Sequence, residues 1–219
     1  MPVLEQLGAD ALRHTLVTYR NTLKRHQADL NKLNVYPVPD GDTGSNMART
    51  LDAVVAELDK HPDSLDETYN AISHGSLMGA RGNSGVILSQ ILRGLSATLK
   101  VASEHGAVKV AEALKAASVA AYDSVLKPIE GTILTVVREA ADAGAALALL
   151  DERIAQLKEP RDRFHALLVQ AELLAQEGME ALARQHYQHL WQEASRLGLS
   201  HWEPGLVSRL ESQATPLSK

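Results

Sequence analysis

The sequence predicts an all-α protein. Apolar residues recur at steps of three, four or seven along most of the 219 residues, which is the pattern of amphipathic helices. No segment shows the alternation typical of strands. Prolines and glycines fall between the periodic segments, where they end one helix and allow the next to begin. We therefore expect a series of helices joined by short turns.

The first predicted helix covers residues 10–33, where a leucine-rich stripe faces one side. Pro37 and Pro39 end it, because proline cannot continue a helix and biases the preceding residue toward extended geometry. Ser64 with Glu67 is a capping-box signal for a third helix. The remaining stripes predict helices over about 47–58, 87–99 and 107–125, and one that opens at Gly131 and Thr132 and runs to Pro160.

The last third of the chain differs in composition from the rest. Phe164, Trp191 and Trp202 are the only phenylalanine and both tryptophans. Apolar stripes over 164–174 and 183–197 flank Gly178, which predicts an antiparallel helix pair. We expect two parts, residues 1–145 and residues 146–219.

Composition excludes several classes of protein. Apolar residues at 45% and charged residues at 22% are typical of a folded globular chain. A net charge of −5 without a basic cluster argues against nucleic-acid binding. The longest apolar run, at 143–150, is too short to cross a membrane, and no basic and apolar leader opens the chain, so we expect a cytoplasmic protein. Because cysteine is absent, any metal would need oxygen or histidine ligands.

The stretch "NVYPVPDGDTGSNM", residues 34–47, is the first candidate site. Asp40 and Asp42 flank a single glycine, so both carboxylates can converge on one hard cation, and oxygen ligands suit Mg²⁺. Gly44, Ser45 and Asn46 then open a helix, where free N–H groups favour an anion. The alternative is a solvated Asp-Gly turn that caps the helix. A calcium loop is excluded, since its glutamate position would be Leu51.

The stretch "GARGNSG", residues 79–85, is the second candidate site. Gly79, Gly82 and Gly85 allow close backbone approach, and Asn83 or Ser84 can cap the helix that follows. The phosphate-loop pattern and its lysine are missing. Taken alone, a glycine-rich loop of this kind more often reflects tight packing between helices than phosphate binding.

Thr132, in "KPIEGTILT" at 127–135, stands at a further helix start. An ordinary N-terminal cap is the simpler interpretation of this residue.

Three motifs in order, "LNKLNVYPVPDGDTGSNM", "GSLMGARGNSGVILSQILRG" and "KPIEGTILTVVREAA", strongly resemble the N-terminal kinase domain of bacterial fatty acid kinase A. That domain is similar to the nucleotide-binding L subunit of dihydroxyacetone kinase. The resemblance covers about residues 6–143. It implies an antiparallel helical barrel that binds ATP and Mg²⁺ at one end.

The resemblance also implies roles for individual residues. Asp40 and Asp42 would hold Mg²⁺ against the ATP phosphates, and Asn34 lies near the place of a third, acidic ligand of the L subunit. The loop over the phosphates would be formed by Gly82, Asn83, Ser84 and Gly79, with Asn46 and Thr132 lining the same site. Phosphoryl transfer is mostly positioning and charge neutralisation, in which Arg81 would take part.

The acceptor implied by the resemblance is a fatty-acid carboxylate on a carrier protein, or another small molecule. After about Ala143 the kinase resemblance stops, so closing helices of the barrel would be replaced and activity reduced. Residues 147–210 instead resemble the C-terminal domain of TssA-type components of type VI secretion, through "LDERIAQLKEPRDRF" and "WEPGLVSRL". This second resemblance implies a homo-oligomer formed through the C-terminal helices, and the alternative function of a non-catalytic assembly module.

Overall fold

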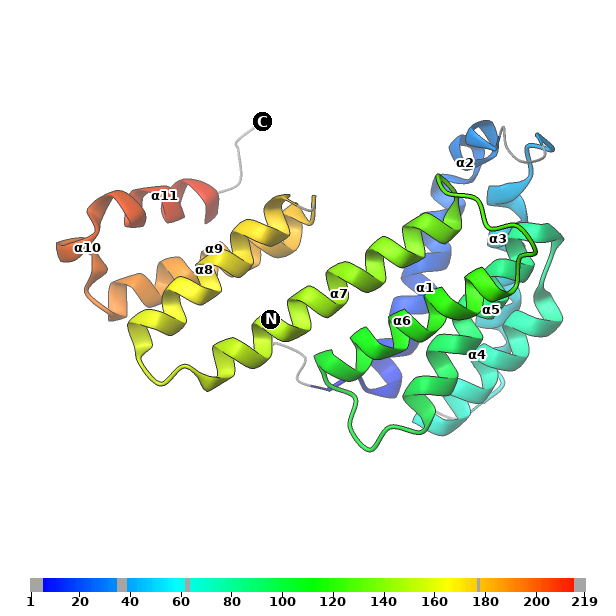
Figure 1. The fold of residues 1–219 in the computed structure, drawn as a ribbon, viewed down its shortest axis with the longest axis horizontal. Helices are drawn as coiled ribbons and strands as arrows, with labels where there is room; N and C mark the ends of the chain where they lie inside the picture. The colour runs from blue at the N-terminus through cyan, green and yellow to red at the C-terminus, as the bar shows by residue number, and fades with distance from the viewer. Residues whose placement is uncertain (1–5, 35–38, 62–63, 177, 215–219) are drawn as a thin grey trace. The chain divides into compact units, whose positions relative to one another are not determined.

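The computed structural model describes residues 6–34, 39–61, 64–176 and 178–214, and these ranges contain helices and no strand, which confirms the all-α prediction (Figure 1). The chain divides into two compact units, Met1–Ala146 and Leu147–Lys219. No helix in the described ranges is long and apolar enough to cross a membrane. The helices that begin in the first unit are α1 (Ala9–Arg25), α2 (Gln27–Leu33), α3 (Thr43–Leu58), α4 (Leu65–Gly79), α5 (Gly82–Lys100), α6 (Ala107–Asp123) and α7 (Ile133–Gln156).

The predicted single helix over 10–33 is wrong, because the chain bends at His26 and forms α1 and α2 instead. His26 has φ −100° and ψ 7°, outside helical geometry, although its N–H still bonds to the Thr22 carbonyl at 3.1 Å. The bend directs α2 against the start of α3, where a Cβ on Gly44 would lie 2.5 Å from the Gln27 carbonyl oxygen. A contact between two helices sets this bend, so the periodicity of the segment gave no sign of it.

Helix α3 is the central element of the first unit, and α1, α2, α4 and α5 all pack against it. Leu51, Val54 and Leu58 are buried almost completely along its length. The largest apolar cluster of the unit surrounds these side chains and adds Leu12, Leu16 and Leu23 from α1, Tyr69 and Ile72 from α4, and Leu88, Leu92 and Leu99 from α5.

Glycines set the spacing between α3 and its neighbours. A Cβ on Gly75 would lie 2.9 Å from the Val54 Cα, and one on Gly79 would lie 2.2 Å from the Ala53 Cβ. Real Cβ contacts are longer than this, so α4 can approach α3 this closely only because these positions have no side chain. Gly94 has the same role between α5 and α6, where a Cβ would lie 3.0 Å from the Ala117 Cα.

Arg13 of α1 joins the C-terminal end of α3 to the start of α4. Its Nη1 donates to the Leu58 carbonyl at 2.8 Å and its Nη2 to the His61 carbonyl at 3.1 Å. Its Nε donates to the Thr68 hydroxyl at 3.1 Å. The guanidinium therefore satisfies carbonyls that the end of a helix leaves without partners. At the same junction the Ser64 hydroxyl accepts from the Glu67 N–H at 3.3 Å, as the capping-box signal predicted.

Three basic side chains contact the Glu57 carboxylate near the same end of α3. Its carboxylate accepts from Lys60 Nζ at 2.7 Å and lies 3.3 Å from His61 Nε2 and 3.1 Å from His74 Nδ1. The side chain is only 14% exposed. The hydrogen bond from Lys60 is the largest cause that lowers the pKa of Glu57, to about 2, with the two histidines acting in the same direction and burial opposing them.

The second unit contains the predicted helix pair, α8 (Pro160–Gln176) and α9 (Glu180–Arg196), followed by α10 (Leu199–Trp202) and α11 (Pro204–Ala214). Helices α8 and α11 both pack against α9. Helices α10 and α11 were not predicted from the sequence, because their apolar stripes are short and no clear capping residue precedes them. The core of this unit is made by Phe164, Leu168, Leu174, Tyr187, Leu190 and Leu210.

The helix spacing leads to a first prediction. Gly79→Ala should lower the free energy of unfolding of the first unit by about 1 to 3 kcal/mol, because the new methyl group would overlap the Ala53 Cβ. Denaturant unfolding followed by circular dichroism measures the change.

The matched control is Gly144→Ala in α7, where the nearest atom is the flexible tip of Leu114 at 3.2 Å. Its effect should stay within about 1 kcal/mol. If the two variants were equally stable, the glycines would not set the helix spacing.

The Glu57 cluster leads to a second prediction, on pH. Because the pKa of Glu57 in the folded protein lies below the ordinary value of 4.5, its contribution to stability is present above about pH 4.5 and is lost as pH falls through about 2. Glu57→Gln should therefore flatten the loss of thermal stability over that interval. Glu104→Gln, at an exposed position between α5 and α6, should leave the acid profile unchanged.

Candidate phosphate and metal site

The two glycine-containing loops predicted from the sequence meet at one end of the first unit. The Ser84 hydroxyl, in the first turn of α5, donates to the Thr43 carbonyl, in the first turn of α3, at 3.4 Å. A Cβ on Gly82 would lie 2.2 Å from Nδ2 of Asn46. Helices α3 and α5 therefore begin side by side, and both present their N-termini at this end.

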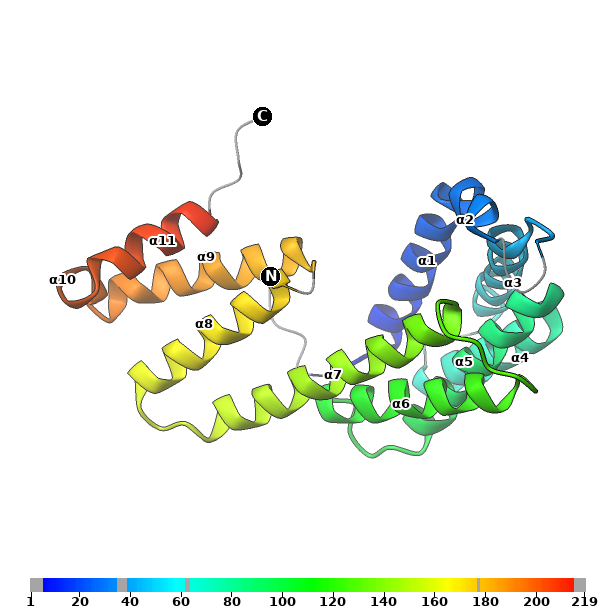
Figure 2. The same cartoon turned by 45° about the horizontal axis from the view of Figure 1, so that its top comes forward.

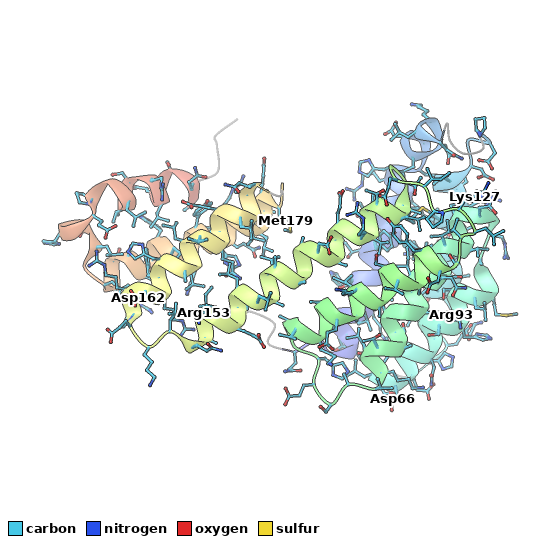
Figure 3. The ribbon with its side chains drawn as sticks, viewed as in Figure 1. Asp66, Arg93, Lys127, Arg153, Asp162 and Met179 are labelled. Carbon is cyan, nitrogen blue, oxygen red and sulfur yellow. The ribbon has the colours of Figure 1, made fainter. Side chains whose placement is uncertain are left out.

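The loop between α6 and α7 belongs to the same end. Ala121 near the end of α6, Leu134 near the start of α7 and Ile87 near the start of α5 share one apolar cluster. The first half of α7 then runs back beside α6 (Figure 1 and Figure 2). Figure 3 labels Lys127 in this loop and Asp66 at the start of α4, and the two lie at opposite ends of the unit. All three predicted motifs thus meet at one end.

The Asp-Gly-Asp turn holds its two carboxylates in different settings. Gly41 takes the left-handed conformation, with φ +64°, which a residue with a side chain rarely adopts. Asp40 is exposed and accepts a hydrogen bond from Asn34 Nδ2, so the structure brings these two residues together. Asp42 is the N-cap residue of α3, but its carboxylate makes no capping bond and has no partner among the described residues. Pro37, which the prediction for this turn included, lies outside the described residues.

The donor set at this turn fits a hard divalent cation. Two carboxylates and the amide of Asn34 offer oxygen atoms, which Mg²⁺ prefers, and Mg²⁺ usually keeps several waters. Within the described ranges no group of three or more histidine, aspartate or glutamate side chains is arranged to hold a metal ion. A metal at Asp40 and Asp42 would therefore take its other ligands from Asn34, from water or from a bound phosphate. Each of these ligand assignments stays a prediction.

The start of α3 has fewer free N–H groups than the sequence analysis expected. The Ser45 N–H donates to Asn31 Oδ1 at 3.1 Å, and the Asn46 N–H donates to the Asp42 carbonyl at 2.8 Å. The expectation of free N–H groups from Gly44 to Asn46 is thus wrong for two of the three. The Ser45 N–H is bonded to Asn31 of α2, because Gly44 has no side chain and lets α2 approach the first turn of α3.

Asn46 is the polar side chain at the junction of the two loops. It is 7% exposed and its amide has no hydrogen-bond partner among the residues that the structure describes. One turn further along α3, the buried Thr50 hydroxyl donates to the Asn46 carbonyl at 2.8 Å and accepts from the Arg81 N–H at 3.3 Å. The backbone of the second loop is thereby bonded to α3. An amide that makes no hydrogen bond to a described residue, placed beside two helix starts, is suited to binding a polar ligand.

The second loop differs from its prediction at the helix cap. Arg81, not Asn83 or Ser84, is the N-cap residue of α5, and its side chain makes no capping bond. The helix begins at Gly82, at least two residues earlier than a cap at Asn83 or Ser84 would give, because Gly82, with φ +57°, turns the chain into the helix. The Arg81 guanidinium is exposed and donates to the Ala80 carbonyl at 2.8 Å, and Asn83 is exposed as well. The predicted roles of Arg81, Asn83 and Gly79 at a ligand stay predictions.

Thr132 caps α7, as the simpler interpretation expected. Its hydroxyl accepts from the Leu134 N–H at 3.3 Å and donates to the Ile129 carbonyl at 2.8 Å. The predicted role of Thr132 at a ligand stays a prediction.

Glu130, just before this cap, is a residue that the sequence analysis missed. Its carboxylate accepts from Thr135 Oγ1 at 2.5 Å, Tyr122 Oη at 2.8 Å and Arg138 Nη2 at 3.3 Å. The hydrogen bond from Thr135 is the largest cause that lowers the pKa of Glu130. These bonds tie the ends of α6 and α7 together. Tyr122 lies eight residues before Glu130, and Thr135 and Arg138 lie five and eight residues after it. No known motif has this spacing.

Comparison with known families gives an independent match. The profile described as Dak2, DAK2 domain, matches residues 37–199, more than half of the chain. An uncharacterized protein of Staphylococcus saprophyticus is 50% identical over 145 residues, which are 64% of this chain and 26% of that protein. Protein YloV of Bacillus subtilis is 46% identical over 127 residues, 58% of this chain and 23% of its own length. An uncharacterized protein of Staphylococcus aureus is 46% identical over 136 residues, 61% and 25%. The chain thus spans about a quarter of the length of these curated relatives.

The matched range bears on the C-terminal part of the chain. It runs past Leu147, where the second compact unit begins, and ends at Leu199 after α9. The DAK2 match therefore includes α8 and α9, which the sequence analysis compared with a secretion component. That comparison stays a prediction.

A third prediction concerns the cap of α7. Thr132→Ala should lower the free energy of unfolding by about 1 kcal/mol, because the Leu134 N–H loses its acceptor. Thr132→Ser keeps the hydroxyl and should restore most of this stability. Thermal unfolding of both variants measures these changes. Equal stabilities of the serine and alanine variants would contradict the assignment of Thr132 as the cap.

Proposed function

The chain belongs to the family of proteins with a DAK2 domain, and we propose on that basis that its first unit binds ATP with Mg²⁺ and transfers a phosphoryl group. The observation that carries the proposal is the meeting of two helix starts beside two carboxylates. Helices α3 and α5 begin in contact through Ser84 and Thr43, and Asp40 and Asp42 precede α3 directly. Helix N-termini favour anions and carboxylates favour cations, so a magnesium nucleotide suits both halves of this site.

The residues of this chain would act mainly by positioning. The carboxylates of Asp40 and Asp42 would hold the metal, with the Asn34 amide beside Asp40. The amide of Asn46 would supply hydrogen bonds to phosphate oxygens from between the two loops. Bound Mg²⁺ would neutralise charge that develops on the transferred phosphoryl group. Phosphoryl transfer of this kind needs no nucleophile from the protein.

The acceptor is the finer part of the proposal. The motifs of residues 30–47, 75–94 and 127–141 resemble those of fatty acid kinase, so we propose a carboxylate of a fatty acid on a carrier protein, with a small molecule as the other choice. The chain spans about a quarter of the length of these curated relatives, so the proposed acceptor concerns only the region that they share with this chain.

The fourth prediction tests nucleotide binding. The wild-type chain should bind MgATP in isothermal titration calorimetry, and Asp40→Asn with Asp42→Asn should weaken binding by more than about 30-fold, equivalent to about 2 kcal/mol. The amides keep the size of the side chains and remove the negative charges that hold the cation.

The matched control is Asp59→Asn, at the C-terminal cap of α3, which should leave the affinity for MgATP unchanged. Titration in EDTA shows whether binding needs the divalent cation. Wild-type protein that does not bind MgATP, or that binds it equally well without both carboxylates, would overturn the proposal.

A further inference from the structure

Two amide side chains of α2 hold Ser45 in the first turn of α3. Asn31 Nδ2 donates to Ser45 Oγ at 2.9 Å, and Asn31 Oδ1 accepts from the Ser45 N–H at 3.1 Å. Gln27 Nε2 donates to the same Oγ at 3.1 Å. Gln27 and Asn31 are four residues apart on one face of α2, so both side chains reach the same serine.

The orientation of the Asn31 amide follows from the bonding partners. A backbone N–H can only donate, so the Asn31 atom facing the Ser45 N–H must be the carbonyl oxygen. The atom facing Ser45 Oγ is then the NH₂ group, which can only donate. The two bonds to one residue therefore exclude the flipped amide.

These contacts determine what the Ser45 hydroxyl can do. A hydroxyl has one proton to donate and two lone pairs to accept with. Asn31 Nδ2 uses one lone pair and Gln27, with its Nε2 turned toward Oγ, uses the other, so in this arrangement the proton points away from α2. The hydroxyl proton has no acceptor among the described residues, and Ser45 is only partly buried. Its hydroxyl is left as a donor that can serve a ligand.

We propose that Asn31 and Gln27 are positioning residues that fix the Ser45 hydroxyl as a hydrogen-bond donor to a phosphate oxygen of the bound nucleotide. This inference rests on the proposed function, because it places the ligand at the start of α3. Phosphate oxygens only accept hydrogen bonds. A hydroxyl whose direction is already set binds them without the cost of reorientation. Ser45 thus acts through its hydroxyl, since its N–H is already bonded to Asn31.

The packing of α2 supports the assignment. Gly44 has no side chain, and a Cβ there would lie 3.0 Å from both Asn31 Oδ1 and the Leu30 Cβ. Leu30 packs against the main apolar cluster of the unit and anchors α2 there. The bend at His26 turns the two amides toward Ser45. Local packing thus holds the donors in place before any ligand arrives.

Asn31→Asp is the discriminating variant and the fifth prediction. The new carboxylate can still accept from the Ser45 N–H, but it offers an oxygen where the amide offered NH₂. The Ser45 proton would then turn toward α2 and be lost to the ligand. We expect the affinity for MgATP, measured by calorimetry, to fall about tenfold, which is about 1.4 kcal/mol. Ser45→Ala should cause a loss of similar size.

The double variant separates the hydroxyl from the added charge. With alanine at position 45, Asn31→Asp should cause little further loss, because no hydroxyl remains to be turned. If it still weakened binding tenfold, the effect would be charge repulsion and the inference would be overturned. Gln27→Glu makes the same change at the second amide, and it leaves the bond from the Ser45 N–H to Asn31 intact. It should weaken binding in the presence of Ser45 and have little effect in Ser45→Ala.

The matched control is Asn70→Asp on α4, where the side chain faces Lys100 Nζ at 2.6 Å. The same chemical change there should leave affinity unchanged. Thermal unfolding of each variant shows whether the fold is retained. Wild-type binding of MgATP with no loss in Asn31→Asp or Ser45→Ala would overturn this inference alone, whereas wild-type protein that does not bind MgATP would overturn the proposed function with it.

Discussion

The distance at which α4 and α5 pack against α3 is the constraint on which the first unit depends. Side chains at Gly75, Gly79 and Gly85 would overlap α3, so these helices lie closer than ordinary side chains allow. That spacing sets the position of the loop between α4 and α5, which places Gly82 against Asn46 and Ser84 against Thr43. A packing requirement in the core thus determines how two loops meet at the surface.

The two ends of α3 are built for different purposes. At its C-terminal end, Arg13 and Glu57 have strong hydrogen-bond partners, and the carbonyls of Val55, Glu57 and Leu58 accept hydrogen bonds. At its N-terminal end, the Asp42 carboxylate and the Asn46 amide have no partner among the described residues. Polar groups left without partners cost stability and are typical of places where a ligand completes the bonding. This difference along one helix agrees with a binding site at the N-terminal end.

The helices and the positions of the motifs could be predicted from the sequence, because amphipathic periodicity and capping are local. Leu51 and Leu58 follow a stripe, and Ser64 precedes Glu67 by the expected three residues. The break at His26 and the hydrogen bonds between Asn31 and Ser45 could not be predicted. They depend on contacts between segments 14 or more residues apart, which leave no periodic signal. The DAK2 match beyond residue 143 was missed because the resemblance rested on motifs that end before it.

Thr50 shows how the buried part of the site differs from the rest of the core. Most buried side chains around α3 contribute to stability by filling space, so an apolar residue of similar size could replace them. Valine has nearly the shape of threonine, yet it would leave the Arg81 N–H and its loop without the hydroxyl that now accepts from it. Anyone who redesigns this core for greater stability must therefore treat position 50 as part of the ligand-binding end, although no ligand would touch it.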